Sequence, residues 1–226
     1  MTDAPFPLDI LQNPGPTALE RLLSGWLGPA PIARSLAARA RAREAHDGED
    51  LRAPAIAIPA ALSRGLATLG RWPDVFRRNH LRSAGDVDVA AGLGRFLVEQ
   101  DDHAFWGFAL KDARLPDPRV WIDDVLDGRR LADARTSRFL LKATLLELIL
   151  GDCTTEAGPG LMSPPDLVLG LVRLDSLGPL TWPTTCWFYA GPDDLAMTME
   201  DVDGVMAWGW RAVRRPIAPE PVALGR

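Results

Sequence analysis

The amino-acid sequence predicts an α+β domain in which helices pack on one antiparallel sheet of about five to six strands. The chain of 226 residues is 47% hydrophobic, which is enough to bury a substantial core. Apolar residues recur at helical spacing near the amino terminus and again at 135–150. Between 95 and 123, short runs rich in Phe, Trp and Val are separated by polar turns, as in antiparallel strands. A change from helical to extended spacing and back favours the α+β class.

The first third of the chain predicts three helices. Thr17 begins a capping-box pattern and is followed by leucines at helical spacing, so we expect a helix that ends at Gly28. A second helix is predicted at 32–45, where nearby acidic residues balance the arginines and indicate a solvated face rather than a phosphate-binding stripe. A third helix should have Pro59 in its first turn and end at Gly70.

The middle of the chain predicts three strands and the most regular helix. The runs RFLVEQ, AFWGFAL and PRVWID predict successive antiparallel strands at 95–100, 104–110 and 118–122. Aromatic residues flank Trp106 in the second strand, so we expect its ring to face the core. The period returns to helical at 135–150. The buried face of this helix should carry Phe139, Ala143, Leu146 and Leu150.

The last third predicts a loop followed by further strands. Glycines and prolines make 152–165 loop-like. The runs TTCWFYA and LAMTME predict a hairpin, while VMAWGWRAV fits either a strand or a helix. The prolines from 216 onwards favour an extended or frayed tail. The chain is therefore divided into an amino-terminal helical extension, an α+β domain and a flexible tail, at 1–57, 58–215 and 216–226.

Composition restricts the classes of function. The formal charge of -5 disfavours a nucleic-acid binder that relies on bulk electrostatics. No helical apolar stretch reaches the ~20 residues that span a bilayer, and the first residues lack the charged and apolar regions of a signal peptide. The two cysteines are far apart, and the histidines lack metal-ligand spacing. We therefore expect a soluble cytoplasmic protein with no membrane contact, no metal and no other cofactor.

Two acidic stretches lie at predicted strand connections. The candidate partner-binding residues in them are Glu99, Asp101, Asp102, His103, Asp193 and Asp194. An enzyme would use His103 as a base that Asp101 or Asp102 orients, whereas a polar hairpin turn would need only their hydrogen bonds. A third interpretation is an exposed acidic rim for a basic partner. On that interpretation, both stretches present carboxylates to solvent without local basic partners.

The segments FLVEQDDHAFWG at 96–107 and LPDPRVW at 115–121 resemble the SUKH superfamily. Members of that family have a Phe-led strand, a Glu-Asn-Gln-like polar turn, a Trp-Gly strand and an Asp-Pro-x-Val-aromatic strand. The resemblance extends over about 58 to 210, although Gln100 and Asp101 stand where Asn and Gln are usual. The residues that match the pattern are Phe96, Glu99, Trp106, Gly107, Asp117, Pro118, Val120 and Trp121.

The resemblance implies a non-enzymatic binding protein. Bacterial members of the SUKH superfamily are mostly immunity proteins that neutralise toxins, often nucleases or deaminases, and a eukaryotic group includes regulators of cell-wall assembly. The expected partner is therefore a cognate, basic protein toxin, and no direct contact with nucleic acid is expected. Mimicry of nucleic-acid charge and occlusion beside the active site are both compatible with this partner. A small enzyme or ligand-binding domain, and an intracellular scaffolding adaptor, are the alternatives.

Overall fold

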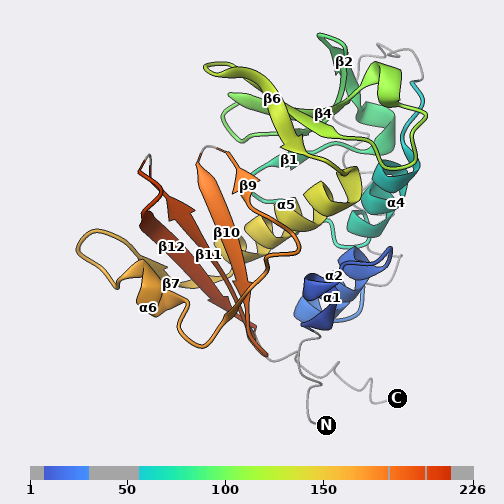
Figure 1. The fold of residues 1–226 in the computed structure, drawn as a ribbon. Helices are drawn as coiled ribbons and strands as arrows, with labels where there is room; N and C mark the ends of the chain where they lie inside the picture. The colour runs from blue at the N-terminus through green and yellow to red at the C-terminus, as the bar shows by residue number, and fades with distance from the viewer. Residues whose placement is uncertain (1–7, 31–55, 183, 202, 215–226) are drawn as a thin grey trace, which may run out of the picture.

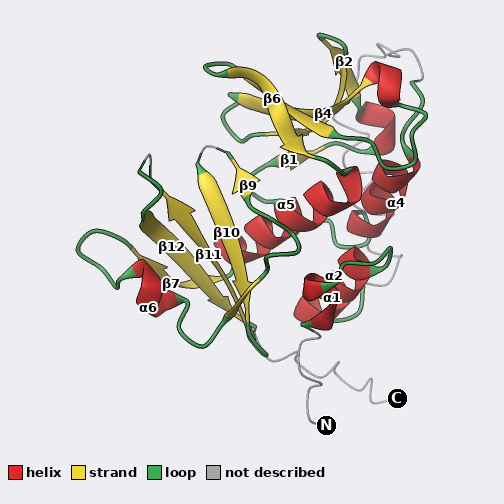
Figure 2. Cartoon of the chain, in the orientation of Figure 1, coloured by secondary structure: helices red, strands yellow, loops and turns green. Residues whose placement is uncertain are grey.

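The computed structural model describes residues 8–30, 56–182, 184–201 and 203–214. Within these residues, two antiparallel sheets of six strands each lie on either side of the long helix α5 (Thr136–Gly151), as Figure 1 and Figure 2 show. The α+β class is confirmed, although the strands form two sheets where the sequence predicted one. The helix predicted at 32–45 and the tail from 216 lie outside the described residues.

The first sheet contains the three strands that the sequence predicts in the middle of the chain. Its order is β1-β3-β4-β5-β6, and β2 also pairs with β3. The Trp106 side chain is 3% exposed and faces the core, as predicted. Its ring centroid lies 6.1 Å from that of Phe139 and 5.1 Å from that of Trp182. The strands are β1 (His80–Leu81), β2 (Asp88–Ala90), β3 (Leu93–Val98), β4 (Ala104–Ala109), β5 (Val120–Asp124) and β6 (Gly128–Asp133).

The second sheet has the order β7-β12-β11-β10-β8, and β9 also pairs with β10. The predicted hairpin is confirmed as β10 and β11, and the undecided run VMAWGWRAV forms β12. The loop predicted at 152–165 is wrong in part. Its first residues form the edge strand β7, and α6 (Pro164–Leu167) follows. The strands are β7 (Cys153–Ala157), β8 (Val172–Arg173), β9 (Leu180–Thr181), β10 (Thr185–Ala190), β11 (Asp194–Glu200) and β12 (Met206–Val213).

The described helices that precede the first sheet are α1 (Asp9–Gln12), α2 (Ala18–Leu27) and α4 (Ala60–Leu69). As predicted, α2 ends at Gly28, whose φ of 86° suits glycine, and α4 ends before Gly70. The capping box is wrong, because the Thr17 side chain makes no capping hydrogen bond. Both longer helices pack into the same core as α5, through buried side chains that include Leu22, Leu23, Leu62 and Leu66.

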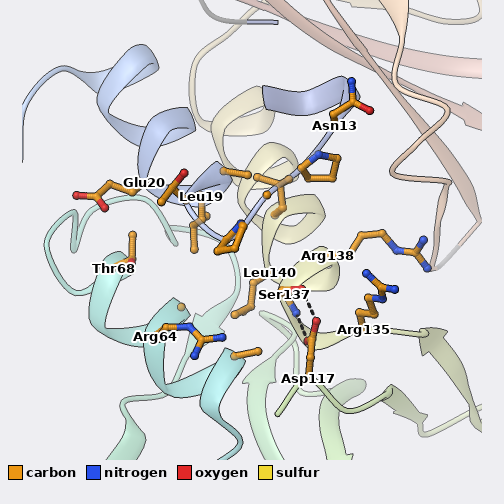
Figure 3. Close-up of a pocket in the computed structure, with 18 of the residues that line it drawn as sticks. Asn13, Leu19, Glu20, Arg64, Thr68, Asp117, Arg135, Ser137, Arg138 and Leu140 are labelled. Atoms are coloured by element: carbon orange, nitrogen blue, oxygen red, sulfur yellow. Dashed lines mark hydrogen bonds between the residues drawn. The ribbon is translucent and has the colours of Figure 1, made fainter. Parts of the chain in front are cut away.

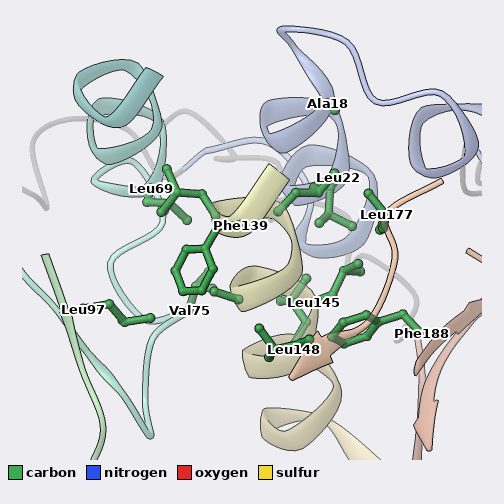
Figure 4. Packing of buried hydrophobic residues seen from close by; sticks show 14 of the residues in the cluster. Ala18, Leu22, Leu69, Val75, Leu97, Phe139, Leu145, Leu148, Leu177 and Phe188 are labelled. Atoms are coloured by element: carbon green, nitrogen blue, oxygen red, sulfur yellow. The ribbon is translucent and has the colours of Figure 1, made fainter. Parts of the chain in front are cut away.

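Helix α5 is buried on most of its circumference because it contacts strands of both sheets as well as α2 and α4. Figure 4 shows Phe139, Leu145 and Leu148 pointing into the core that these elements share. The predicted buried face was only partly right. Phe139 is fully buried, as is Leu145, whereas Leu146 and Leu150 are only partly covered. A helix between two sheets needs no single apolar stripe, which explains the difference.

One segment before β5 holds the amino-terminal ends of two helices. The carbonyl oxygen of Pro116 accepts a hydrogen bond from the backbone N–H of Ala61 in α4, at 2.8 Å. The carbonyl oxygen of Pro118 accepts one from the first residue of α5, also at 2.8 Å. The Asp117 carboxylate accepts bonds from the Ser137 backbone N–H at 2.8 Å and from its hydroxyl at 2.6 Å. These bonds satisfy donors that a helix cannot satisfy within itself.

A buried ion pair and a hydrogen bond from the same ammonium group join the end of β6 in the first sheet to the residue before β9 in the second. Lys142 of α5 is 2% exposed, and its Nζ lies 2.5 Å from Asp133 Oδ2. The same ammonium group donates a hydrogen bond to the carbonyl oxygen of Pro179 at 2.8 Å. Arg138 Nε donates to the other Asp133 oxygen at 2.9 Å. Burial lowers the pKa of Lys142, while Asp133 acts in the opposite direction.

A second buried charge, Glu147 of α5, holds the chain just before β1. Its Oε2 accepts hydrogen bonds from the backbone N–H groups of Arg77 and Arg78, at 3.0 and 3.1 Å. Its Oε1 accepts bonds from the backbone and side-chain nitrogens of Asn79, at 3.0 and 2.7 Å. Four donors therefore compensate the removal of this carboxylate from water.

Candidate functional site

The turn between β3 and β4 carries four of the predicted partner-binding residues. Glu99 Oε2 accepts hydrogen bonds from the backbone N–H of Asp101 at 2.8 Å and of His103 at 3.4 Å. Asp102 adopts a φ of 60°, in the left-handed region that Asp tolerates. The Glu99 carboxylate therefore shapes the turn, while the side chains of Asp101, Asp102 and His103 are exposed.

The turn between β5 and β6 is equally well fixed. Asp124 Oδ1 accepts hydrogen bonds from the backbone N–H of Leu126 at 2.8 Å and of Asp127 at 3.2 Å. The Trp182 indole donates to Asp124 Oδ2 at 2.5 Å. The hydrogen bond from the Leu126 N–H, and to a smaller extent that from the Trp182 indole, holds the pKa of Asp124 below its ordinary value. Gly128 closes the turn with a φ of 73°, which glycine adopts without strain.

These two turns lie side by side at one end of the first sheet. The backbone N–H of Val125 donates to the His103 carbonyl oxygen at 2.9 Å, and Ala104 pairs with Asp124 directly behind it. In Figure 1 this is the end from which β6 starts, away from its junction with α5. We call the combined surface the hairpin-tip surface, which consists of Asp101, Asp102, His103, Val125, Leu126 and Asp127.

The hairpin-tip surface combines apolar and acidic side chains. Leu126 is 89% exposed and Val125 is 65% exposed, although both are large apolar residues. Among the described residues, Asp101 and Asp102 have no ion-pair partner, while Asp127 pairs with Arg130 at 2.9 Å. An exposed apolar centre bordered by polar residues is typical of a protein–protein contact. The acidic half of this surface is predictable from the sequence, whereas the apolar half was not predicted.

The second predicted site, Asp193 and Asp194, lies on the other sheet and is not brought together with the first. These carboxylates have no basic residue near them in the sequence, as expected, but the structure gives both of them basic partners from a distant segment. Asp194 Oδ1 lies 3.1 Å from Arg211 Nε, and Asp193 Oδ1 lies 3.3 Å from Arg214. Both arginines come from the end of β12 and the residue after it, which the antiparallel pairing places beside the start of β11. The charge of this turn is therefore largely balanced.

The geometry gives little support to the enzyme interpretation of the first turn. The His103 imidazole makes no hydrogen bond to Asp101 or Asp102 in the described part of the chain. In the same residues, no group of three or more His, Cys, Asp and Glu side chains could hold a metal ion.

Cys186 is buried, and desolvation raises the pKa of its thiol to about 12. No described helix is long and apolar enough to cross a membrane.

A wide cleft of about 960 Å³ lies between α1 and α2 on one side and α4 and the start of α5 on the other (Figure 3). Its wall carries Arg64 and Arg135, whose guanidinium groups have no ion-pair partner among the described residues. The two carboxylates of the same wall already have partners: Asp117 accepts a hydrogen bond from Ser137, and Glu20 forms an ion pair with Arg71. No sequence motif links these residues, so the cleft was not predictable from the sequence.

Comparison of the chain with protein-family models, curated proteins and solved structures found no match. Membership of the SUKH superfamily therefore stays a prediction that rests on the segments at 96–107 and 115–121. The structure gives several of those residues an architectural role. Phe96 and Trp106 are in the core, Glu99 shapes a turn, and Asp117 holds the start of α5.

Proposed function

We propose that this protein is a non-enzymatic, SUKH-like immunity protein of the bacterial cytoplasm, which binds and neutralises a basic protein toxin. The observation that carries the proposal is the hairpin-tip surface, where Leu126 and Val125 are exposed beside the carboxylates of Asp101 and Asp102. A catalytic site would instead gather its reactive groups in a sheltered place. The surface is suited to binding another protein.

The charge of the protein suits a toxin that acts on nucleic acid. Such a toxin needs a basic surface for its phosphate-bearing substrate. A chain with a formal charge of -5 is attracted to that surface at long range, and salt weakens the attraction. The exposed apolar residues then supply the desolvated contact area that electrostatic attraction alone does not provide.

The cleft between the helices favours one alternative, a ligand-binding domain. Its volume of about 960 Å³ falls within the range of small-molecule sites, and Arg64 and Arg135 would select an anionic ligand. Substitution distinguishes the two functions. If the protein is a ligand-binding domain, replacing both arginines by glutamine abolishes binding of the anionic ligand. If it is an immunity protein, the same variant still neutralises the toxin.

The experiment that tests the proposal uses the gene beside the one that encodes this chain, because immunity genes normally adjoin their toxin genes. The neighbouring gene is expressed from an inducible promoter in a bacterial host, with and without this chain. We expect growth arrest without the chain, growth in its presence, and a stable complex of the two purified proteins. A neighbouring product that arrests growth equally in both strains and forms no complex contradicts the proposal.

A further inference from the structure

Leu126 stands out among the apolar side chains of the described residues because it is 89% exposed at the tip of a hairpin. Turn positions usually carry Gly, Asn, Asp or Ser, whose conformations and hydrogen bonds suit them. A leucine there contributes no core packing, and its exposure to water is unfavourable. Local structure therefore gives no reason for a leucine at this position.

The backbone beneath Leu126 is fixed before any partner arrives. Asp124 accepts hydrogen bonds from two N–H groups of the turn and from the Trp182 indole, and Val125 is bonded to His103 of the neighbouring turn. An apolar side chain on a rigid support loses little backbone entropy when it is buried in a complex. This is the property of an interface anchor.

The charges around Leu126 restrict what it can contact. Asp101, Asp102 and Asp127 are all exposed, and only Asp127 has a basic partner among the described residues. Carboxylates in this arrangement repel phosphate groups, so an anionic lipid surface and a nucleic acid are both disfavoured. A protein surface with lysine or arginine side chains around an apolar pocket is complementary to both features.

We infer that Leu126 is the anchor of the interface, and that it enters an apolar pocket bordered by basic side chains on the toxin. This inference rests on the proposed function and makes it more specific. Of the two mechanisms left open by the sequence, it selects occlusion over mimicry of nucleic-acid charge. Few carboxylates are involved, and the protruding group is apolar. Asp101 and Asp102 then accelerate the encounter, while Leu126 slows dissociation.

The test compares three variants of the full chain for binding to the purified product of the neighbouring gene. Leu126→Asn places a residue that favours turns at the tip and should preserve the fold. Leu169→Asn is the matched control, because Leu169 is 76% exposed in the connection between α6 and β8. Asp101→Asn combined with Asp102→Asn removes two charges, and Asn also tolerates the left-handed φ of residue 102.

We expect Leu126→Asn to weaken binding at least about tenfold through faster dissociation, and Leu169→Asn to bind like the wild type. The Asp101→Asn, Asp102→Asn variant should associate several times more slowly at low salt, with a flatter salt dependence. If the wild type binds and Leu126→Asn binds equally well with an unchanged melting temperature, the inference is overturned and the proposed function stands. If the wild type itself does not bind, both are overturned.

Discussion

Replacing Lys142 by methionine should destabilise the protein by about 3 kcal/mol, because it breaks a buried ion pair by removing one partner. The Lys142 ammonium group is 2.5 Å from Asp133 and 2.8 Å from the Pro179 carbonyl oxygen, and the side chain is 2% exposed. Methionine fills a similar volume, so the loss is electrostatic rather than a cavity. Arg138 still pairs with Asp133, which places the cost at the lower end of the range of about 3–5 kcal/mol for broken buried pairs.

The assay is urea unfolding monitored by circular dichroism. The free energies of unfolding are compared on condition that their dependence on urea concentration has the same slope in each variant. The matched control is Arg130→Met, which removes the surface pair between Arg130 and Asp127 at 2.9 Å. Exposed pairs of this kind contribute only about 0.2–1 kcal/mol, so this variant should remain near the wild type. Both variants replace a basic residue by methionine. The difference between their losses in the free energy of unfolding therefore measures the effect of burial.

A Lys142→Met variant that loses no more stability than Arg130→Met would refute this reasoning. A second check is the double variant Asp133→Asn, Lys142→Met. Because Asn is uncharged, the double variant no longer contains a buried carboxylate that has lost its closest cationic partner. It should therefore be destabilised by less than the sum of the two single changes, and an additive result would show that the two groups do not interact.

Three further results are expected. Trp106→Ala should cost roughly 3–5 kcal/mol, since it removes a buried ring that packs on two other aromatic rings; an unchanged melting temperature would contradict its place in the core. Because the pKa of Asp124 in the folded protein lies below its ordinary value of 3.8, this group contributes stability that is present above that pH and lost as pH falls through the folded pKa. Asp124→Asn should therefore lose less stability than the wild type on acidification, as measured by urea unfolding across pH 2–6. A thiol reagent at pH 8 should modify Cys153 before Cys186, whose pKa is about 12, and the reverse order in mass spectra would show that the core opens.

The parts of the fold that were predictable are those whose signal lies within one segment. The strand that contains Trp106 and the helix α5 have strong local patterns and were predicted to within one residue, while the strands on either side were predicted with bounds displaced by two residues. The strand β7 was missed because its residues are mostly polar and its pairing partner, β12, lies far along the chain. For the same reason, nothing in the sequence separated the strands into two sheets. Lys142 and Glu147 interrupt the apolar run of α5, yet partners distant in sequence allow both to be buried.

The candidate site shows the same limit. The acidic turn was found because five polar residues, 99–103, are adjacent in the sequence. Leu126 was missed because one leucine in a turn carries no pattern, although its place in Asp-Val-Leu-Asp-Gly is unusual for a turn. The partners of Asp193 and Asp194 come from the far end of another strand, and pairing across a sheet is not visible along the sequence.

The segment that holds α4 and α5 has a consequence for the order of folding. The first amide groups of α4 and α5 are bonded to the carbonyl oxygens of Pro116 and Pro118, which are only two positions apart. The same short connection therefore caps the first turns of two helices that lie far apart in sequence, and displacing it removes a protein acceptor from both at once. If the connection opens as one unit, the amide hydrogens of Ala61 and Thr136 should show the same opening free energy once their intrinsic exchange rates are divided out. An insertion at this connection would then weaken the starts of both helices, whereas one in the turn at Leu126 would leave them unchanged.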